Sequence, residues 1–151
     1  EREQTPLHLT GRCLCGAVTY DCGAEPASVT YCHCDTCRRM TGSAFNIGVG
    51  VPAAELHVTG QVRGYQTAGQ PDESAIREFC PDCGSPLFTR YPTMVFIKAG
   101  SLDDPTVVSP TRQIWTEMAV PWSRIPDGLT SHPRNGPSPW KSGTPRNDAG
   151  S

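Results

Sequence analysis

Short runs of β-branched and aromatic residues recur about every ten residues along the chain, and glycine or proline separates most of them. No long stretch shows the period of about 3.6 residues that marks an amphipathic helix. We expect strands at AVTY 17–20, SVTY 28–31, FNIGVGV 45–51, ELHV 55–58, VRGYQT 62–67, IREF 76–79, PLFTR 86–90, VFIKAG 95–100 and TRQIWT 111–116. The pattern therefore predicts an all-β fold, that is, a mainly β domain.

One segment departs from this pattern and predicts a short helix. In DTCRRMTG, residues 35–42, Asp35 can cap a helix and Gly42 can end it. Cys37 then lies in the first turn, where the positive end of the helix dipole favours a thiolate. We therefore expect one or two short helices beside the strands.

Length and composition predict one domain followed by a tail. The chain has 151 residues and a mass of 16.3 kDa, which is enough for a single hydrophobic core. From residue 131 onward the chain becomes rich in proline, glycine and serine, a composition typical of an arm rather than of a core element. We expect a zinc-binding domain over residues 1–130 and a C-terminal tail over residues 131–151.

Charge and hydropathy disfavour two kinds of partner, nucleic acids and membranes. The net charge is −2, and no run of basic residues is longer than the pair Arg38–Arg39, so the basic patch of a nucleic-acid-binding protein is absent from the sequence. Nowhere do eighteen apolar residues follow one another, so no membrane span is expected. The first residues, EREQTPLHLT, do not resemble a signal peptide, and we expect a cytoplasmic protein.

The eight cysteines are spaced like metal ligands rather than like disulfide partners. The sulfurs of a C-x-C pair lie too close along the chain for an unstrained disulfide. C-x-x-C commonly offers two thiolates to one tetrahedral zinc ion, and Gly84 after Cys83 lets the chain turn around such an ion. The alternative, a redox-active C-x-x-C, usually opens a helix in a βαβ unit, which is not visible around residues 79–87.

Seven of the cysteines divide into a set of four and a set of three. Three of them lie within six residues and can converge on one ion from a single loop: Cys32, Cys34 and Cys37. The two remaining pairs need each other to complete a tetrahedron and would form a closed, structural site: Cys13, Cys15, Cys80 and Cys83. We therefore expect two zinc ions per chain, the second in an open site with three protein ligands.

Two residues remain as alternatives for the fourth ligand of the open site. In an extended C-H-C segment the side chain of His33 points away from both neighbouring sulfurs, so we expect a partly exposed histidine that packs or hydrogen-bonds nearby. Cys22 lies outside every motif, and we expect it to be an ordinary small buried residue.

Five segments, in this order, resemble the family that unites glutathione-dependent formaldehyde-activating enzymes with centromere protein V. They are GRCLCGAVTY 11–20, CHCDTCRRMTGSAF 32–45, FCPDCGSPLF 79–88, AGSLDDP 99–105 and PWSRIPDGL 121–129. The resemblance covers residues 7–129 and implies an Mss4-like fold of small antiparallel sheets, stapled by two zinc sites with the division given above. It also implies carbon–sulfur lyase activity; the namesake reaction condenses formaldehyde with glutathione to S-hydroxymethylglutathione.

The open site suggests the chemistry directly. A zinc ion held by three thiolates is a weak Lewis acid but accepts a fourth sulfur readily, so Cys32, Cys34 and Cys37 are the candidate catalytic residues. We expect the enzyme to form or break a carbon–sulfur bond between a small-molecule thiol and an electrophilic carbon such as an aldehyde, with glutathione as a candidate co-substrate. Arg39, or its neighbour Arg38, could hold a substrate carboxylate.

Two other function classes remain open at this point. A zinc-binding module without enzymatic activity would bind a protein partner, and a thiol-zinc redox sensor would release its metal when the cysteines are oxidised. A second copy of the chain, in a homodimer, is a further candidate partner. A pocket beside the three-cysteine site would favour the enzyme over the interaction module.

Overall fold

The computed structural model describes residues 8–66 and 75–136. The strands are β1 (Leu9–Arg12), β2 (Thr19–Cys22), β3 (Ser28–Cys32), β4 (Asn46–Pro52), β5 (Leu56–Thr59), β6 (Arg63–Gln66), β7 (Ile76–Phe79), β8 (Pro86–Arg90), β9 (Met94–Lys98), β10 (Arg112–Ile114) and β11 (Thr130–Ser131). The helical elements are α1 (Asp35–Thr41) and the 3₁₀ turns η1 (Ala53–Glu55), η2 (Ala99–Ser101), η3 (Pro105–Val107) and η4 (Thr116–Met118). The mainly β prediction is confirmed, and α1 is the short helix expected over residues 35–42, although its N-cap is Cys34 rather than Asp35.

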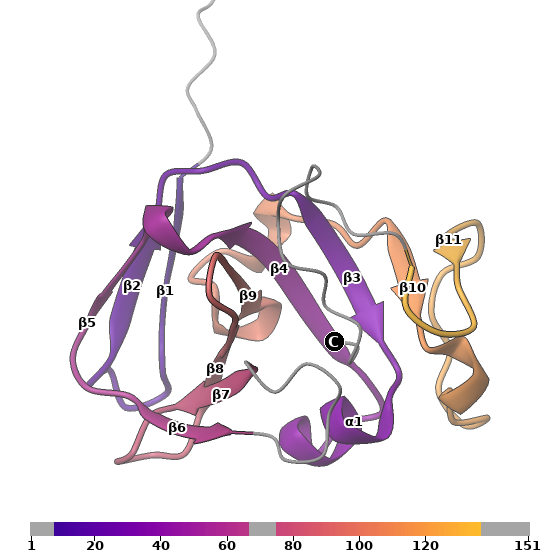
Figure 1. Ribbon diagram of the computed structural model, residues 1–151, viewed down its shortest axis with the longest axis horizontal. Coiled ribbons are helices and arrows are strands. Elements are labelled where there is room, and N and C mark those ends of the chain that lie inside the picture. Colours follow the sequence, from indigo (N-terminus) through magenta and orange to yellow (C-terminus); the bar gives the residue numbers. More distant parts are fainter. Residues whose placement is uncertain (1–7, 67–74, 137–151) are drawn as a thin grey trace, which may run out of the picture.

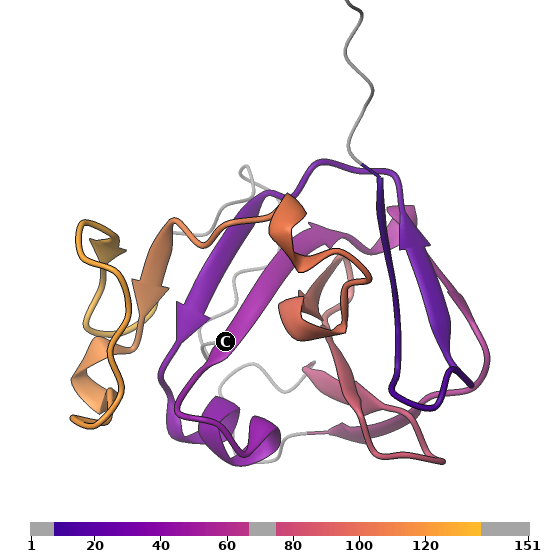
Figure 2. The same cartoon turned by 180° about the vertical axis from the view of Figure 1, so that it is seen from behind.

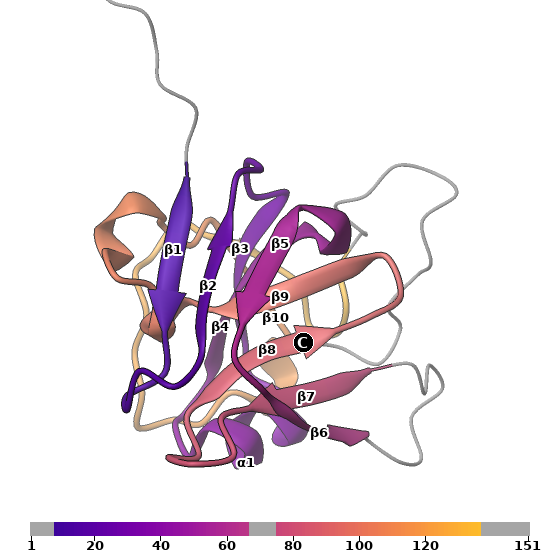
Figure 3. The same ribbon diagram turned by 90° about the vertical axis from the view of Figure 1, so that its left-hand side faces the viewer.

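The strands form two sheets that lie against each other (Figures 1 and 3). The smaller sheet has the order β1-β2-β5 and is antiparallel throughout. The larger has the order β11-β10-β3-β4-β9-β8-β7-β6. Its pairs are antiparallel from β3 to β6, but β10 runs parallel to both β3 and β11, a feature that the antiparallel prediction did not include. In Figure 2, β10 and β11 form the outer edge of the molecule, away from the smaller sheet.

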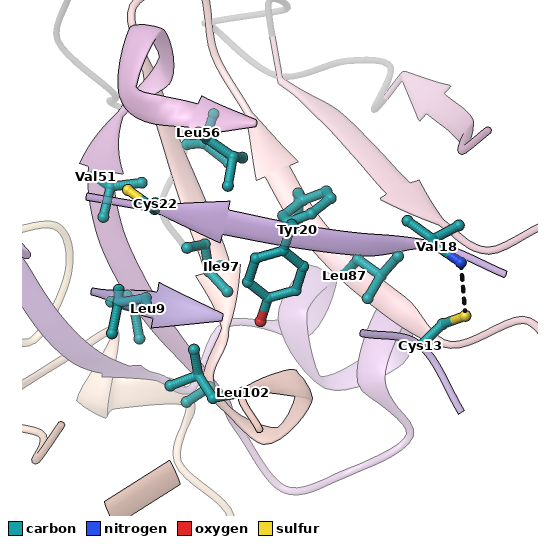
Figure 4. Packing of buried hydrophobic residues seen from close by; sticks show 14 of the residues in the cluster. Leu9, Cys13, Val18, Tyr20, Cys22, Val51, Leu56, Leu87, Ile97 and Leu102 are labelled. Carbon is teal, nitrogen blue, oxygen red and sulfur yellow. Dashed lines mark hydrogen bonds between the residues drawn. The ribbon is translucent and has the colours of Figure 1, made fainter. Parts of the chain in front are cut away.

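The main hydrophobic core lies between the two sheets, as Figure 4 shows. Tyr20 of β2 packs edge-on against Phe88 of β8, with ring centroids 5.1 Å apart. Cys22 is fully buried beside Val51, as expected for a cysteine outside the metal motifs. Since each fully buried aliphatic or aromatic side chain contributes roughly 1.5–3 kcal/mol, this core holds the two sheets together.

The opposite face of the large sheet carries a line of polar side chains, which we call the polar row. Its members are Cys32 on β3, Asn46 on β4, Lys98 on β9, Thr89 on β8 and Arg77 on β7. Cys32 pairs directly with Asn46, and Gly48, two residues along β4, pairs with Lys98. Because side chains alternate along a strand, these residues lie on one face, and the pairings of β8 continue the same alternation to Arg77. All five members are buried.

The described part of the predicted tail lies against the domain. β11 pairs with β10, and beyond it the backbone N–H of Trp115 donates a hydrogen bond to the carbonyl oxygen of Arg134. The indole N–H of Trp115 donates to Asn135 Oδ1 at 3.0 Å. The rest of the predicted tail, residues 137–151, lies outside the described residues, and the domain boundary at residue 130 stays a prediction.

No helix within residues 8–66 and 75–136 has both the length and the apolar character needed to cross a bilayer.

Candidate functional site

The four sulfur atoms of Cys13, Cys15, Cys80 and Cys83, the four-cysteine cluster, all lie within 4.8 Å of one another. Two of these separations are 3.7 Å, between Cys13 and Cys15, and 3.8 Å, between Cys15 and Cys80. A zinc ion with four Zn–S bonds of about 2.3 Å requires sulfurs about 3.8 Å apart, so the donor set fits a tetrahedral zinc ion. It joins the turn after β1 to the turn between β7 and β8.

Backbone N–H groups and one hydroxyl surround these sulfurs. The N–H of Val18 donates to the Cys13 sulfur at 3.3 Å, and the N–H of Asp82 donates to the Cys80 sulfur at 3.3 Å. Ser85 lies 3.2 Å from the Cys83 sulfur and lowers the pKa of that thiol to about 5 by hydrogen bonding. Such donors favour the thiolate form that a metal ligand needs.

Gly84 makes the turn after Cys83 possible. Its φ of 79° is in the left-handed region, where a side chain would strain the backbone. Its N–H donates to the carbonyl oxygen of Cys80 at 2.8 Å and closes the turn. The sequence suggested that Gly84 lets the chain turn after Cys83, and its backbone conformation in the structure makes that turn.

The sulfurs of Cys32, Cys34 and Cys37, the three-cysteine cluster, also lie within 4.8 Å of one another, and all three residues are buried. Cys32 ends β3, Cys34 caps the N-terminus of α1, and Cys37 lies in the first turn of that helix. The chain from β3 into α1 therefore brings three sulfurs together from six consecutive residues. A buried group of soft sulfur donors at this spacing also fits zinc.

The pKa values of the three thiols in this cluster are shifted in different directions. Hydrogen bonds from Cys32 and then from Cys37 lower the pKa of Cys34 to about 3. Burial raises the pKa of Cys32 well above its usual value. The hydrogen bond with Cys32 lowers the pKa of Cys37, whereas the hydrogen bond with Cys34 and burial raise it. The net effect raises the pKa of Cys37 to about 12. Of the three thiols, Cys34 is the one whose pKa is lowered, so it is the most acidic of the cluster.

Neither alternative fourth ligand joins this cluster. Among the residues that the structure describes, the three cysteines are the only His, Cys, Asp or Glu side chains that converge there. His33 is buried rather than partly exposed, and its Nε2 is 2.9 Å from Gln113 Oε1. Cys22 lies in the core between the two sheets. The described protein therefore supplies three ligands at this site.

A pocket of about 590 Å³ lies beside the four-cysteine cluster, whose Cys13 lines it, while Cys32, Cys34 and Cys37 are not among its lining residues. Its walls come from the turn after β1, the end of α1, the start of β4, the start of β8 and the segment that follows β9. The lining residues are Arg12, Cys13, Leu14, Thr41, Ser43, Phe45, Asn46, Ile47, Ser85, Pro86, Lys98, Ala99, Gly100, Ser101, Leu102 and Asp103. This volume is in the range of small-molecule sites.

Two members of the polar row connect the pocket with the three-cysteine cluster. Asn46 lines the pocket and pairs with Cys32 across β3 and β4. Lys98 also lines the pocket, and its charge acts on the thiols of all three cysteines. Burial lowers the pKa of Lys98, while those thiols act to raise it. Its Nζ donates a hydrogen bond to Thr89 Oγ1 at 3.3 Å.

The sequence analysis did not select Lys98, Asn46 or Arg77. One signal was present: a single cation stands inside each of two otherwise apolar or strand-like runs, Lys98 in VFIKAG and Arg77 in IREF. A charged residue at a position that alternation places inside the fold indicates a polar interior site. For Asn46 no comparable signal exists, because asparagine at a strand start is ordinary.

Arg39, the arginine that the sequence suggested for substrate binding, is exposed on α1 and is not among the lining residues of the pocket. Its neighbour Arg38 lies 3.3 Å from Asp35, one turn earlier on the same helix. A role for Arg39 in binding a carboxylate stays a prediction.

Comparison with known proteins agrees with the arrangement of the cysteines. The family of the glutathione-dependent formaldehyde-activating enzyme (GFA) matches residues 8–118, a span that contains all seven cysteines of the two clusters. The chain belongs to the GFA family. The resemblance seen in the sequence segments is thereby confirmed.

Two relatives of this GFA-family chain show how far the similarity extends. Over 81 residues it is 30% identical to a protein of Schizosaccharomyces pombe described as an uncharacterized lyase. That match spans 54% of this chain and 56% of the yeast protein. The fold resembles the crystal structure of a Rhodobacter sphaeroides protein, with a TM-score of 0.52 and 25% identity, over 67% of this chain and 91% of the other. The family and the lyase relative together support an enzymatic role related to thiols.

Proposed function

We propose that this GFA-family chain is a zinc-dependent carbon–sulfur lyase that joins a small thiol to an electrophilic carbon, or separates them, beside Cys32, Cys34 and Cys37. The observation that carries the proposal is the three-cysteine cluster: its three buried sulfurs converge with no fourth ligand from the described protein. The nearby pocket supplies room for a small molecule, which favours an enzyme over a protein-interaction module.

The two clusters have different tasks in this proposal. Cys13, Cys15, Cys80 and Cys83 hold a structural zinc ion that ties two distant turns together. Cys32, Cys34 and Cys37 would hold a second zinc ion, whose all-sulfur ligand set would favour the anionic form of a nearby thiol over activation of water. The substrate thiol then needs no separate strong base in the protein.

In this proposal the residues around the pocket bind and orient the substrates. The turn after β1 and the segment after β9 form two walls of the pocket, which would hold thiol and electrophile in a fixed orientation. Arg12 and Asp103 give the outer part of the pocket one cation and one anion. Such a wall suits a zwitterionic thiol such as glutathione, which we propose as a co-substrate.

Cobalt substitution tests the proposal, because Co²⁺ replaces zinc and reports on its ligands through absorption. Titration of the Co²⁺ protein with glutathione, cysteine and 2-mercaptoethanol should raise the sulfur-to-metal charge-transfer band for at least one thiol. Cys34→Ser should abolish this change, and Cys22→Ala, a cysteine in the core, should keep it. The proposal is wrong if no thiol alters the spectrum of the Co²⁺ protein.

A second measurement follows the product. With formaldehyde and the responding thiol, NMR should detect faster formation of the hemithioacetal than in buffer alone. A redox sensor would behave differently: mild peroxide would release zinc while thiols left the metal spectrum unchanged. We place the protein in the cytoplasm in this proposal, where small thiols are abundant and reduced. A homodimer stays a separate expectation.

A further inference from the structure

Lys98 is a buried cation whose surroundings contain sulfur rather than carboxylate. Its side chain belongs to a residue that is only 7% exposed, and no ion pair joins it to an acidic residue in the described ranges. The charged or titratable groups that act on it are Arg77 and the thiols of the three-cysteine cluster. A buried ammonium group requires compensation by hydrogen bonds and by negative charge. Lys98 is therefore placed for an anion that forms at or near these sulfurs.

Asn46 is the second unusual member of the polar row. It is 3% exposed, it lines the pocket, and its side-chain amide forms no hydrogen bond with the described residues. Because the side chain lines the pocket, its amide N–H groups can donate hydrogen bonds to a ligand there. Its position opposite Cys32 places it beside the same cluster that Lys98 faces.

Gly48 is a neighbour of both residues in the large sheet. It pairs with Lys98 and lies two residues from Asn46 on the same face of β4. A Cβ atom added at Gly48 would lie 3.5 Å from Asn46 Nδ2 and 3.4 Å from the Cβ of Phe96. The Asn46 amide therefore lies within contact distance of position 48, whose strand partner is Lys98.

We infer that Lys98 and Asn46 together bind the carbonyl oxygen atom of the electrophile. This inference rests on the proposed function and assigns two residues to it. The ammonium group of Lys98 and the amide N–H of Asn46 are donors, and they stabilise negative charge on oxygen as the carbon–sulfur bond forms. They act as catalytic residues because they touch the reacting oxygen.

The step balances without an added reactant. An electron pair of the substrate thiolate forms the bond between sulfur and the carbonyl carbon, and the π pair of the C=O bond moves onto oxygen. The oxygen takes a proton from Lys98, and the proton that the substrate thiol released restores the ammonium group. The net reaction is thiol plus aldehyde to hemithioacetal. In the reverse direction the hydroxyl proton returns to Lys98 as the carbon–sulfur bond breaks.

The test uses the zinc-loaded full chain with variants that change one donor each. Lys98→Met removes the charge at similar length, Lys98→Arg keeps it, and Asn46→Leu removes the amide. Lys141→Met is the matched control, because Lys141 is the other lysine of the chain. For glutathione and formaldehyde, Lys98→Met and Asn46→Leu should each lower kcat/KM roughly 100-fold or more, the usual effect of losing an oxyanion donor. Lys141→Met should match the parent protein.

Two further readouts separate this inference from the proposed function. Thiol titration of the Co²⁺ form should give the same spectral change in Lys98→Met as in the parent protein, because the lysine serves the carbonyl and not the sulfur. Formate, an unreactive oxyanion of similar size, should bind the parent protein in a ¹³C NMR titration and should not bind Lys98→Met or Asn46→Leu. If thiols never perturb the cobalt spectrum, the proposed function fails, while loss of formate binding would still support the oxygen site.

Three results would overturn the inference. The first is an unchanged kcat/KM in folded, zinc-containing Lys98→Met and Asn46→Leu. The second is loss of the thiol-dependent cobalt signal in Lys98→Met, which would assign the lysine to the sulfur. The third is a covalent adduct on Lys98 after treatment with formaldehyde and borohydride at native zinc content, which would mean that the amine attacks the aldehyde itself. Circular dichroism and zinc analysis establish folding, and Lys98→Arg supplies a result if Lys98→Met does not fold.

Discussion

The backbone N–H of Cys37 donates a hydrogen bond to the sulfur of Cys34, with 3.4 Å between the two atoms. The same sulfur therefore caps helix α1 and belongs to the three-cysteine cluster. Because the N-terminus of a helix carries partial positive charge, the bond favours the thiolate form of Cys34. Helix formation and assembly of the cluster are thus coupled through one atom.

The two clusters should differ in what they contribute to stability. Cys80→Ser should lower the free energy of unfolding by more than about 4 kcal/mol, because loss of a structural metal is among the most destabilising single changes. Cys34→Ser should cost much less, since Cys32, Cys34 and Cys37 are close in sequence and their metal closes only a short loop. Thermal and urea unfolding of both variants measures this; equal losses would contradict the division of tasks.

The chain should hold two zinc ions, one in each cluster. Metal analysis of the purified protein should give two equivalents, and Cys22→Ala should keep both, because Cys22 lies in the core away from the clusters. Cys34→Ala should retain only the ion of the four-cysteine cluster at full occupancy. A parent protein with a single zinc ion, or a Cys22→Ala variant that loses one, would refute the assignment.

Zinc binding to the three-cysteine cluster should release about two protons at pH 7, rather than three. At this pH Cys34, with a pKa lowered to about 3 by hydrogen bonds from Cys32 and Cys37, is already a thiolate. Cys32, whose pKa is raised by burial, and Cys37, whose pKa is raised to about 12, are still thiols. Both must lose a proton to bind the metal, so affinity should rise with pH.

Calorimetry in buffers of different ionisation enthalpy counts these protons. The starting material should keep zinc in the four-cysteine cluster, so that only the three-cysteine cluster is filled. The slope of log affinity against pH should be about two around neutrality, because two protons leave for each ion bound. A slope near three would show that Cys34 carries a proton before the metal arrives.

The segment that follows β11 should stabilise the three-cysteine cluster through its contacts with Trp115. Trp115 packs against that cluster, and Asn135 Oδ1 accepts the hydrogen bond from its indole N–H. Asn135→Ala should lower stability by about 1 kcal/mol, the usual loss for one such bond. Trp115→Ala should cost more, because it also removes buried contact with the cluster. Urea unfolding compares the two, and Arg124→Ala, at an exposed position, is the control.

The effect of a C-terminal deletion on thermal stability should depend on where the shortened chain ends. A chain ending at residue 136 keeps the hydrogen bonds between residues 132–135 and the segment 113–117. A chain ending at residue 132 loses the contacts of Arg134 and Asn135 with Trp115 and should melt at a lower temperature. Thermal unfolding of both chains decides this, and equal melting temperatures would show that those contacts contribute nothing.

The sequence by itself determined the features that depend on neighbouring residues. The strand positions followed from composition and turn residues, the end of helix α1 from Gly42, and the cysteine sets from their spacing. The expected cap at Asp35 was wrong, because the sulfur of Cys34 caps the helix. The chain before β2 gave no strand signal, because LTGR is mostly polar, and β1 forms by pairing with β2. The short strand β11 was missed for a similar reason, since β10 supplies its partner.

Only the tertiary structure decided which distant residues share a site. Lys98 and Cys32 are far apart in the sequence, and the polar row brings them together through the registers of β3, β4 and β9. A shift of one residue in either register would turn Lys98 toward the opposite face. Those registers are set by burial of the apolar face against the smaller sheet, which is a property of the whole chain. The spacing of the cysteines is local and can be read from the sequence, whereas the pocket and its lysine depend on long-range packing.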